Sequence, residues 1–270
     1  MAIPINKSRI TDLEEFDQLP LKSPQKRYLI LSMQRTGSYY ISRRLCNIKN
    51  MFGMPSEYFH PKSIQALLPR LMRPFTLNDY KNGRIKLNDY LKSVEFARTT
   101  DDGYFGMKAQ PHQLQSLFNG DTDEIIHFIS SFDKVILLTR KDKLGQAIST
   151  CKAIYTNEWF DNQASFHLED KDIKKFFSSI AGNISRFIEE EEFLLCAKEK
   201  IKKEILHIDY EDLEQDNTKI FKLIVDYLSG QNDLFFEEIN SFVEIPKKNN
   251  ADLTKNLKKK FIQYISEGIF

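Results

Sequence analysis

The chain has 270 residues, of which 41% are hydrophobic and 29% are charged, and its formal net charge is +1 at pH 7. This length and composition suit a globular domain with a sizeable core, and the near-neutral charge predicts neither nucleic-acid nor membrane binding. Residues 1–19 lack the apolar segment of a signal peptide, and no apolar run approaches the ~20 residues that span a bilayer, so no integral membrane segment is expected.

The first predicted elements are four short strands. Residues 1–25 are expected to form an irregular lead-in that ends at Pro24. The strands are predicted at four apolar runs: Arg27–Leu31, Tyr104–Met107, Val135–Leu138 and Glu204–Ile208. Helical patterns separate these runs, and strands that alternate with helices predict βα units and a mainly parallel sheet covered by helices. The fold class predicted from the pattern is therefore α/β.

Helices are predicted from their caps and their apolar spacing. Ser63 is expected to cap a helix that begins with an apolar stripe, and Gly230 is expected just past a helix over Asn217–Leu228. Residues 170–200 alternate apolar and charged groups at helical spacing, and their acidic run Glu189–Glu192 is expected to be solvated. The buried face of that helix is expected at Phe176, Phe177, Ile180, Ile184, Phe187 and Ile188.

Two further segments have less distinctive patterns. Arg73–Gly83 is polar and rich in turn residues, which is typical of a mobile insertion on the substrate side. Residues 251–270 are predicted to form a C-terminal helix, with Lys247, Lys248 and Lys258–Lys260 making this end of the chain basic. We expect that helix to be amphipathic and solvated.

The residues after the first strand predict a binding site for an anion. Gly37 allows a sharp turn, and the first amides of the following helix then point at whatever occupies the turn. Thr36 and Ser38 add hydroxyl donors, and Arg35 adds a fixed positive fork. We call Gln34–Ser38 the anion cradle.

Two of the later predicted strands also carry candidate residues at their carboxyl ends. In an open parallel sheet, the ligand crevice lies beyond the carboxyl ends of the strands. The anion cradle, Lys108 and Arg140 all fall at such ends. The pattern therefore predicts one shared site, independently of any family.

Four segments in this order carry a family resemblance. They are Gln34–Ser38, Gly53–Phe59, Gly106–Lys108 and Arg140–Ser149, with a weaker echo at Ile208–Leu213. They resemble the Q-R-S-G-S-type loop, the G-x-P-x-E-F-F-like segment, the G-x-K strand and the R-x-D-x-x-x-Q-A-x-S stretch of the sulfotransferase family typified by bacterial trehalose 2-sulfotransferase. The resemblance covers roughly residues 28–159.

The resemblance implies a sulfotransferase fold with a P-loop-like central parallel sheet flanked by helices on both faces, as one domain over residues 1–270. It implies transfer of a sulfuryl group from 3′-phosphoadenosine 5′-phosphosulfate to a hydroxyl of a sugar or glycolipid. Because the family includes dimers, a homodimer is among the expectations. Residues His60–Asp102, which are expected to shape the acceptor pocket, contain no recognisable motif.

The resemblance also assigns donor-binding residues. Gln34, Arg35, Thr36, Gly37, Ser38 and Tyr39 would hold the 5′-phosphosulfate. Arg140 and Ser149 would hold the ribose 3′-phosphate, since arginine grips phosphate with two hydrogen bonds. The tail of this chain departs from the family pattern, so no tail contact is carried over.

Three residues are candidates for catalysis. Glu57 matches the glutamate proposed as the family's general base, and aromatic neighbours that desolvate it would raise its pKa. His112 is the rival base, because histidine has the better unperturbed pKa and it follows Lys108 closely. Lys108 would contact the transferring sulfuryl group. Trp159 would either stack on a sugar or adenine or serve as a core or dimer residue.

Cysteine and histidine usage bears on the compartment and on metal chemistry. Three widely spaced cysteines, Cys46, Cys151 and Cys196, favour a reducing cytoplasm over a disulfide framework or a zinc site. The five histidines show no paired spacing, and the resemblance requires no metal. We therefore expect a cytoplasmic enzyme that works without a metal cofactor.

Two other functions remain open on the sequence. A P-loop-like nucleotide kinase or phosphotransferase would want G-x-x-x-x-G-K-[ST], but no lysine follows Gly37 here. A nucleotide- or glycan-binding module that has kept the fold without activity is the second alternative, since fold does not establish catalysis.

Overall fold

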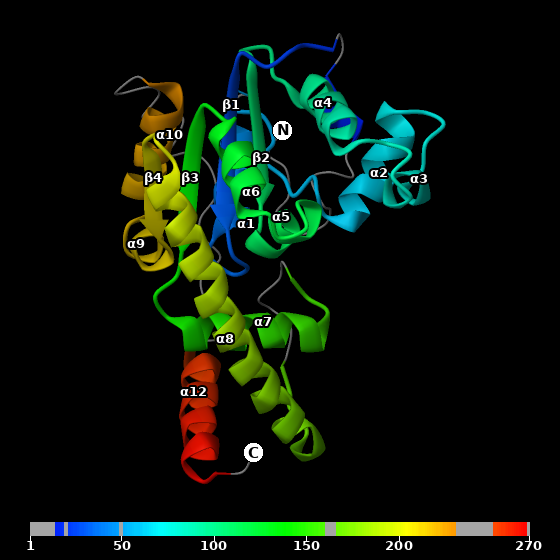
Figure 1. The fold of residues 1–270 in the computed structure, drawn as a ribbon. Coiled ribbons are helices and arrows are strands. Elements are labelled where there is room, and N and C mark those ends of the chain that lie inside the picture. Colours follow the sequence, from blue (N-terminus) through cyan, green and yellow to red (C-terminus); the bar gives the residue numbers. More distant parts are fainter. Residues whose placement is uncertain (1–13, 19–20, 49–50, 160–165, 231–250, 269–270) are drawn as a thin grey trace.

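The protein is described by a computed structural model of residues 14–18, 21–48, 51–159, 166–230 and 251–268 (Figure 1). Its centre is a sheet of four parallel strands in the order β2-β1-β3-β4. The strands are β1 (Lys26–Ser32), β2 (Tyr104–Ala109), β3 (Lys134–Thr139) and β4 (Ile205–Asp209). All four predicted strands are confirmed. β1, β2 and β3 are largely buried, as suits strands of a covered sheet, whereas the edge strand β4 is only partly buried.

Alternate residues of the strands face two hydrophobic cores. One core contains Leu29 of β1 and Leu137 of β3, and the C-terminal helix and several other helices place buried side chains in it. These other helices include α2 (Pro61–Leu71), α4 (Leu87–Arg98), α5 (Pro111–Leu117), α6 (Thr122–Ser130), α7 (Lys143–Thr156) and α8 (Asp170–Lys200). The other core contains Ile30 and Ile136 and is covered by α1 (Ser38–Asn47), α9 (Tyr210–Gln215) and α10 (Asn217–Ser229). The expected α/β fold, with helices on both faces of a parallel sheet, is confirmed.

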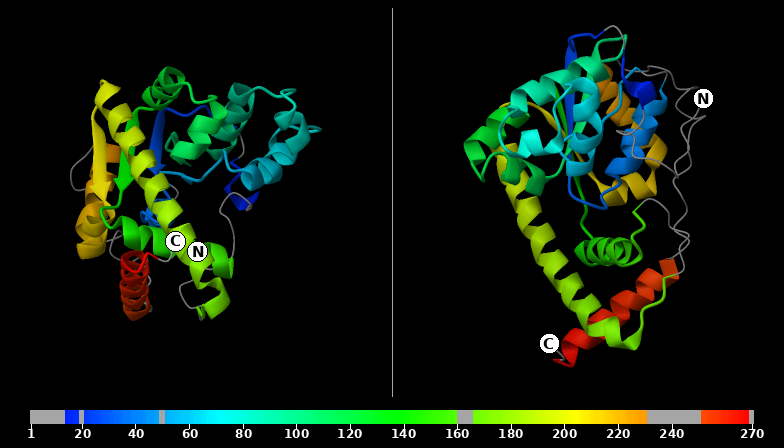
Figure 2. Two further views of the ribbon diagram at one scale, coloured as in Figure 1. Left: turned by 60° about the horizontal axis from the view of Figure 1, so that its bottom comes forward. Right: turned by 90° about the vertical axis from the view of Figure 1, so that its right-hand side faces the viewer.

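A second group of helices lies beyond the carboxyl ends of the strands. The turn after β3 leads down to α7, which crosses below the sheet, and α8 runs past both (Figures 1 and 2). The C-terminal helix α12 (Ala251–Ser266) packs at the far end of α8, where the Phe177 ring lies 5.7 Å from that of Phe261 and 5.1 Å from that of Tyr264. The helix predicted over residues 170–200 is therefore confirmed, and it joins the sheet to the C-terminal helix.

Two details of α8 correct the sequence-based expectation. Ile188 was expected on the buried face, but its side chain is 42% exposed. Glu190 was expected in solvent but is only 5% exposed, because α5 packs on α8 there and brings His112 within 3.6 Å of its carboxylate. A long straight helix touches different partners along its length, so one apolar stripe does not describe its burial.

Of the two predicted helix caps, one differs in the structure and one is confirmed. The N-cap of α2 is His60, whose Nδ1 accepts a hydrogen bond from the backbone N–H of Lys62 at 3.2 Å, and the predicted cap Ser63 lies inside the first turn. Pro61 explains the earlier start, because proline suits the first position of a helix. By contrast, Gly230 ends α10 in the left-handed conformation at φ 71°, as predicted.

Short helices occupy the remaining segments. Within Arg73–Gly83, α3 (Leu77–Lys81) begins at Thr76, whose hydroxyl exchanges capping contacts with Asp79. The lead-in contains one 3₁₀ turn, Glu14–Phe16, and its residues 1–13 lie outside the described ranges. Every helix in the described parts of the chain is too short or too polar to cross a lipid bilayer.

Candidate active site

The helices that follow the neighbouring strands β1 and β3 pack on opposite faces of the sheet. The helix that follows β1 packs on one face of the sheet, where Ile41 lies in one core. The helix that follows β3 contributes Ile148 to the core on the other face. Neighbouring parallel strands whose helices leave to opposite faces leave a crevice at their carboxyl ends, and ligands of such sheets bind there.

The predicted anion cradle lies at this crevice, and its backbone turns sharply. Arg35 and Gly37 both have positive φ, at 62° and 80°. Thr36 stabilises the turn by donating its hydroxyl proton to the carbonyl of Met33 at 2.9 Å. Helix α1 begins directly after Gly37 without a side-chain cap hydrogen bond. No side chain of the cap residue therefore covers the first amides of α1, and an anion site at this turn stays a prediction.

Three cations gather beside the anion cradle, and we call Arg35, Arg140 and Lys152 the cation cluster. Arg35 donates from Nε to Ser149 Oγ at 2.9 Å, and Arg140 donates from Nη1 to the Arg35 carbonyl at 3.0 Å. Burial lowers the pKa of the Arg35 guanidinium, and the charge of Arg140 lowers it further. Burial also lowers the pKa of the Lys152 ammonium, with Arg35 as the second cause.

The cation cluster has little negative charge to balance it. Within the described ranges its one ion pair is a loose one, between Arg140 Nη2 and Asp142 Oδ2 at 3.9 Å. The Arg140 side chain is 8% exposed, and its Nε has no hydrogen-bond partner among the described residues. Buried cations that repel one another are stabilised by an anion, so this arrangement suits a phosphate or sulfate group.

A second polar group surrounds Glu57. The carboxylate Oε1 lies 2.9 Å from Lys108 Nζ, and Oε2 accepts hydrogen bonds from Gln110 Nε2 at 2.9 Å and Gln113 Nε2 at 3.0 Å. The backbone places these groups together, because Ser56 bridges the edge of β2 and accepts a hydrogen bond from the Lys108 N–H at 2.8 Å. The structure therefore brings two of the three predicted catalytic residues into direct contact.

The surroundings of Glu57 oppose the raised pKa that the sequence suggests. Burial by itself raises the pKa of this carboxyl group, but the charge of Lys108 and hydrogen bonds from Lys108, Gln110 and Gln113 lower it to about 2. The carboxylate is consequently ionised at neutral pH. Desolvation is present, as expected from the aromatic neighbours, but three donors outweigh it.

His112 lies elsewhere on α5. Its half-exposed side chain points to α8, where Nδ1 is 3.6 Å from Glu190 Oε1.

Two other predicted site residues form hydrogen bonds within α1. The Tyr39 hydroxyl accepts a hydrogen bond from Arg43 Nε at 2.9 Å, and the carbonyl of Ser38 accepts one from the Ser42 hydroxyl at 2.9 Å. The described residues contain no group of three or more His, Cys, Asp or Glu side chains that would hold a metal ion.

A family model for Stf0 sulphotransferases matches residues 27–252. The chain belongs to the Stf0 sulphotransferase family. A search of curated proteins finds no match. Among solved structures, the chain is similar to a sulfotransferase from Alicyclobacillus acidocaldarius, with 12% identity, a TM-score of 0.48, and coverage of 90% of this chain and 93% of that one. It is also similar to the sulfotransferase domain of the Synechococcus PCC 7002 olefin synthase, with 15% identity, a TM-score of 0.43, and coverage of 93% and 97%.

Membership of the Stf0 family confirms the resemblance read from the four segments, and with it the sulfotransferase fold and a transferase enzyme. The match extends well beyond residues 28–159 and includes the weaker echo at Ile208–Leu213. Family membership therefore supports sulfuryl transfer as the chemistry of this protein.

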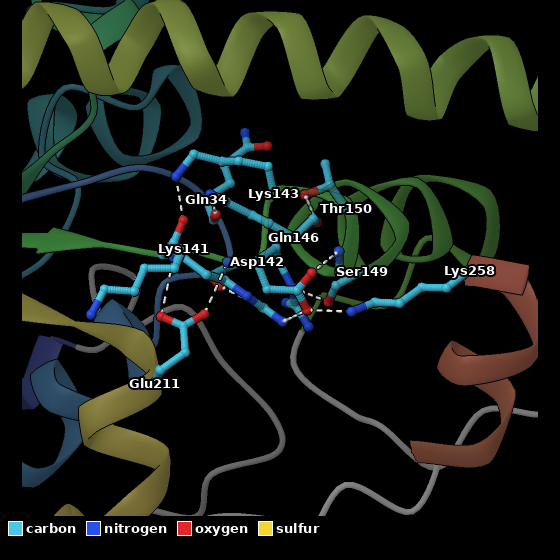
Figure 3. A network of polar contacts seen from close by, with 12 residues as sticks. Gln34, Lys141, Asp142, Lys143, Gln146, Ser149, Thr150, Glu211 and Lys258 are labelled. Atoms are coloured by element: carbon cyan, nitrogen blue, oxygen red, sulfur yellow. Dashed lines mark hydrogen bonds and ion pairs between the residues drawn. The ribbon is translucent and has the colours of Figure 1, made fainter. Parts of the chain in front are cut away.

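The candidate site contains contacts that the sequence pattern does not predict. Gln146 donates from Nε2 to the Gln34 carbonyl at 2.7 Å (Figure 3). Arg186 of α8 donates from Nη2 to Gln34 Oε1 at 3.1 Å. Gln146 lies within a quoted motif and could have been given a role. Arg186 carries no local signal, because only the packing of α8 on α7 brings it to the anion cradle.

Helix α9 contains residues of the weaker resemblance at Ile208–Leu213, and they contact the turn after β3. The Tyr210 ring packs 4.3 Å from the Arg140 guanidinium carbon. The Glu211 carboxylate accepts hydrogen bonds from the backbone N–H groups of Lys141 and Asp142, both at 3.1 Å (Figure 3). Residues from the last strand and its helix therefore hold the turn after β3, and with it Arg140, in place.

Trp159 contacts the cation cluster through its backbone. Its carbonyl accepts a hydrogen bond from Arg35 Nη1 at 2.8 Å, so the segment that follows α7 helps to orient Arg35. The ring is partly exposed. A stacking role for it stays a prediction.

Proposed function

We propose that this Stf0 family member transfers the sulfuryl group of 3′-phosphoadenosine 5′-phosphosulfate to a hydroxyl group of a carbohydrate or glycolipid. The observation that carries the proposal is the cation cluster, which lies at the crevice of the sheet beside an uncapped helix start. In the reaction the acceptor oxygen bonds to sulfur and the bond from sulfur to the bridging oxygen breaks. Adenosine 3′,5′-bisphosphate leaves, and the acceptor proton goes to the base.

The donor binds through two anionic ends. Gln34–Tyr39 hold the 5′-phosphosulfate with the amides of α1, and Arg140 and Ser149 hold the 3′-phosphate. Ser149 suits this role, because its oxygen accepts a hydrogen bond from Arg35 and its own proton remains for a phosphate oxygen. Lys152, one turn after Ser149 on α7, adds positive charge on the same side.

The contact between Glu57 and Lys108 makes the base responsive to the donor. Because three side chains donate hydrogen bonds to it, the Glu57 carboxylate has a pKa of about 2 and is a weak proton acceptor. A bound sulfuryl group attracts Lys108 toward the developing charge on the leaving oxygen. Losing that partner raises the pKa of Glu57, so the group becomes a better general base when the donor is in place.

Calorimetry with product nucleotides tests the donor site. Adenosine 3′,5′-bisphosphate should bind without added metal and more tightly than adenosine 5′-monophosphate. Arg140→Ala should weaken binding of the bisphosphate by roughly 2–3 kcal/mol, because a charge-assisted contact to a buried phosphate is lost, and should leave the monophosphate nearly unaffected.

Arg84→Ala is the matched control, since Arg84 is an arginine with a 71% exposed side chain whose ion pair is to Asp79. Equal losses for both nucleotides in Arg140→Ala would contradict a 3′-phosphate role. Tighter binding of ATP with Mg²⁺ than of the bisphosphate would favour the kinase alternative. A screen of sugar acceptors with labelled donor then identifies the acceptor.

A further inference from the structure

The C-terminal helix reaches the proposed donor site through one side chain. Lys258 of α12 places its Nζ 2.6 Å from Asp142 Oδ2, at the start of α7 (Figure 3). The buried side chains of Leu257, Phe261 and Tyr264 hold α12 in this place. Lys258 lies beyond residue 252, where the match with the family model ends.

Asp142 stands between Lys258 and Arg140. Its Oδ1 accepts a hydrogen bond from the Gly145 N–H at 2.9 Å, which caps α7, and its Oδ2 is 3.9 Å from Arg140 Nη2. The glycine makes room for this arrangement, because a Cβ at Gly145 would lie 2.1 Å from Asp142 Oδ2. One carboxylate oxygen thus faces two cations, and it is much closer to the lysine.

That carboxylate would oppose the proposed ligand if Lys258 were absent. A carboxylate beside Arg140 competes with phosphate for the same guanidinium hydrogens, and its charge repels the phosphate. Lys258 neutralises Asp142 and holds Oδ2 at hydrogen-bond distance, away from Arg140. Arg140 is then left with an unpartnered Nε and no close ion pair among the described residues.

We propose that Lys258 is a positioning residue, which holds Asp142 off Arg140 and so keeps Arg140 available for the 3′-phosphate of the nucleotide. The inference rests on the proposed function, because it assumes that Arg140 binds that phosphate. It makes the C-terminal helix a part of the donor site although no residue of that helix needs to touch the nucleotide.

Calorimetry on variants of the full chain tests the inference. Lys258→Met should weaken binding of adenosine 3′,5′-bisphosphate about tenfold and leave binding of adenosine 5′-monophosphate unchanged, because only the 3′-phosphate meets Arg140. Asp142→Asn should bind the bisphosphate at least as tightly as the wild type, since asparagine still caps α7 but carries no charge. The double variant Lys258→Met with Asp142→Asn should regain wild-type affinity.

Two controls separate positioning from simple loss of structure. Lys258→Arg keeps the ion pair and should bind the bisphosphate normally, and Lys259→Met, at an exposed neighbour on α12, should have no effect. Unchanged affinity in Lys258→Met would overturn the inference, and so would a double variant as weak as the single one, because Lys258 would then act on the nucleotide directly. A wild type that does not distinguish the two nucleotides would instead overturn the proposed donor site.

Discussion

Glu57 is the residue at which the structure most changes the chemical argument. It is a carboxylate held by one lysine and two glutamines, rather than a protonated acid in an apolar pocket. A group with a pKa of about 2 serves as a base only if a partner moves. The catalytic role that we propose for Glu57 therefore depends on the position of Lys108.

Glu57→Gln should lower the rate of sulfuryl transfer by roughly 10²–10⁴-fold, because the variant keeps the shape but loses the proton acceptor. Binding of adenosine 3′,5′-bisphosphate should stay nearly unchanged, since Glu57 lies outside the anion cradle. Turnover with labelled donor and one sugar acceptor measures the rate. His112→Asn is the comparison and should have a modest effect; a near-normal rate in Glu57→Gln with a collapse in His112→Asn would move the base to the histidine.

Acid should remove the stability that Glu57 contributes. Because its pKa in the folded protein is about 2, below the ordinary value of 4.5, its contribution is complete above about pH 5 and is lost as the pH falls toward 2. A shift of this size corresponds to about 3 kcal/mol. Urea unfolding of the wild type and of Glu57→Gln should differ most at pH 7 and converge near pH 2, and a difference independent of pH would rule out this linkage.

The turn between β1 and α1 is the element on which the anion cradle depends. Gly37 takes a positive φ there, and a Cβ at this position would lie 2.7 Å from Leu213 Cδ2 of α9. The close approach ties the turn to the last strand-helix unit of the sheet. Both conformation and space therefore require glycine.

Gly37→Ala should lower the free energy of unfolding by roughly 1–3 kcal/mol, because alanine is strained at this φ and pushes on α9. It should also weaken binding of the bisphosphate by displacing the first amides of α1. Gly182→Ala is the matched control, since a Cβ at that helical position meets nothing within 4 Å, and it should raise stability by about 0.5–1 kcal/mol. Equal stability of both variants in denaturant unfolding would show that the turn tolerates a side chain.

At the scale of the whole molecule, α8 connects the sheet to the C-terminal helix. Phe187 lies in the core against the sheet, while Phe177 packs on the aromatic rings of α12. The helix therefore packs against the sheet through one part of its length and against α12 through another. Its two ends bury side chains in different surroundings.

Phe177→Ala should lower the free energy of unfolding by about 3–5 kcal/mol, because a buried aromatic ring is replaced by a cavity between α8 and α12. Ile188→Ala, on the same helix but 42% exposed, should stay within about 0.5 kcal/mol of the wild type. Chemical denaturation of both variants measures the difference. A loss in Ile188→Ala as large as that in Phe177→Ala would mean that the exposed face of α8 is covered in solution.

The predicted burial on α8 is wrong for a tertiary reason. The path of the helix brings α5 to Glu190 and leaves Ile188 in solvent, and a local pattern does not contain these neighbours. The start of α2 is a different case, because His60 and Pro61 are local signals that favour a cap three residues before Ser63.

The strands, the parallel sheet and the position of Gln34–Ser38 beside Arg140 follow from the local pattern, because they depend on local periodicity and on where strands end. The local pattern does not tell which side chains from distant segments meet. Gln113 reaches Glu57 across 56 positions, Lys258 reaches Asp142 across 116, and Arg186 reaches Gln34 across 152. Contacts between distant positions depend on how whole helices pack, and packing sums many weak interactions that no short segment encodes.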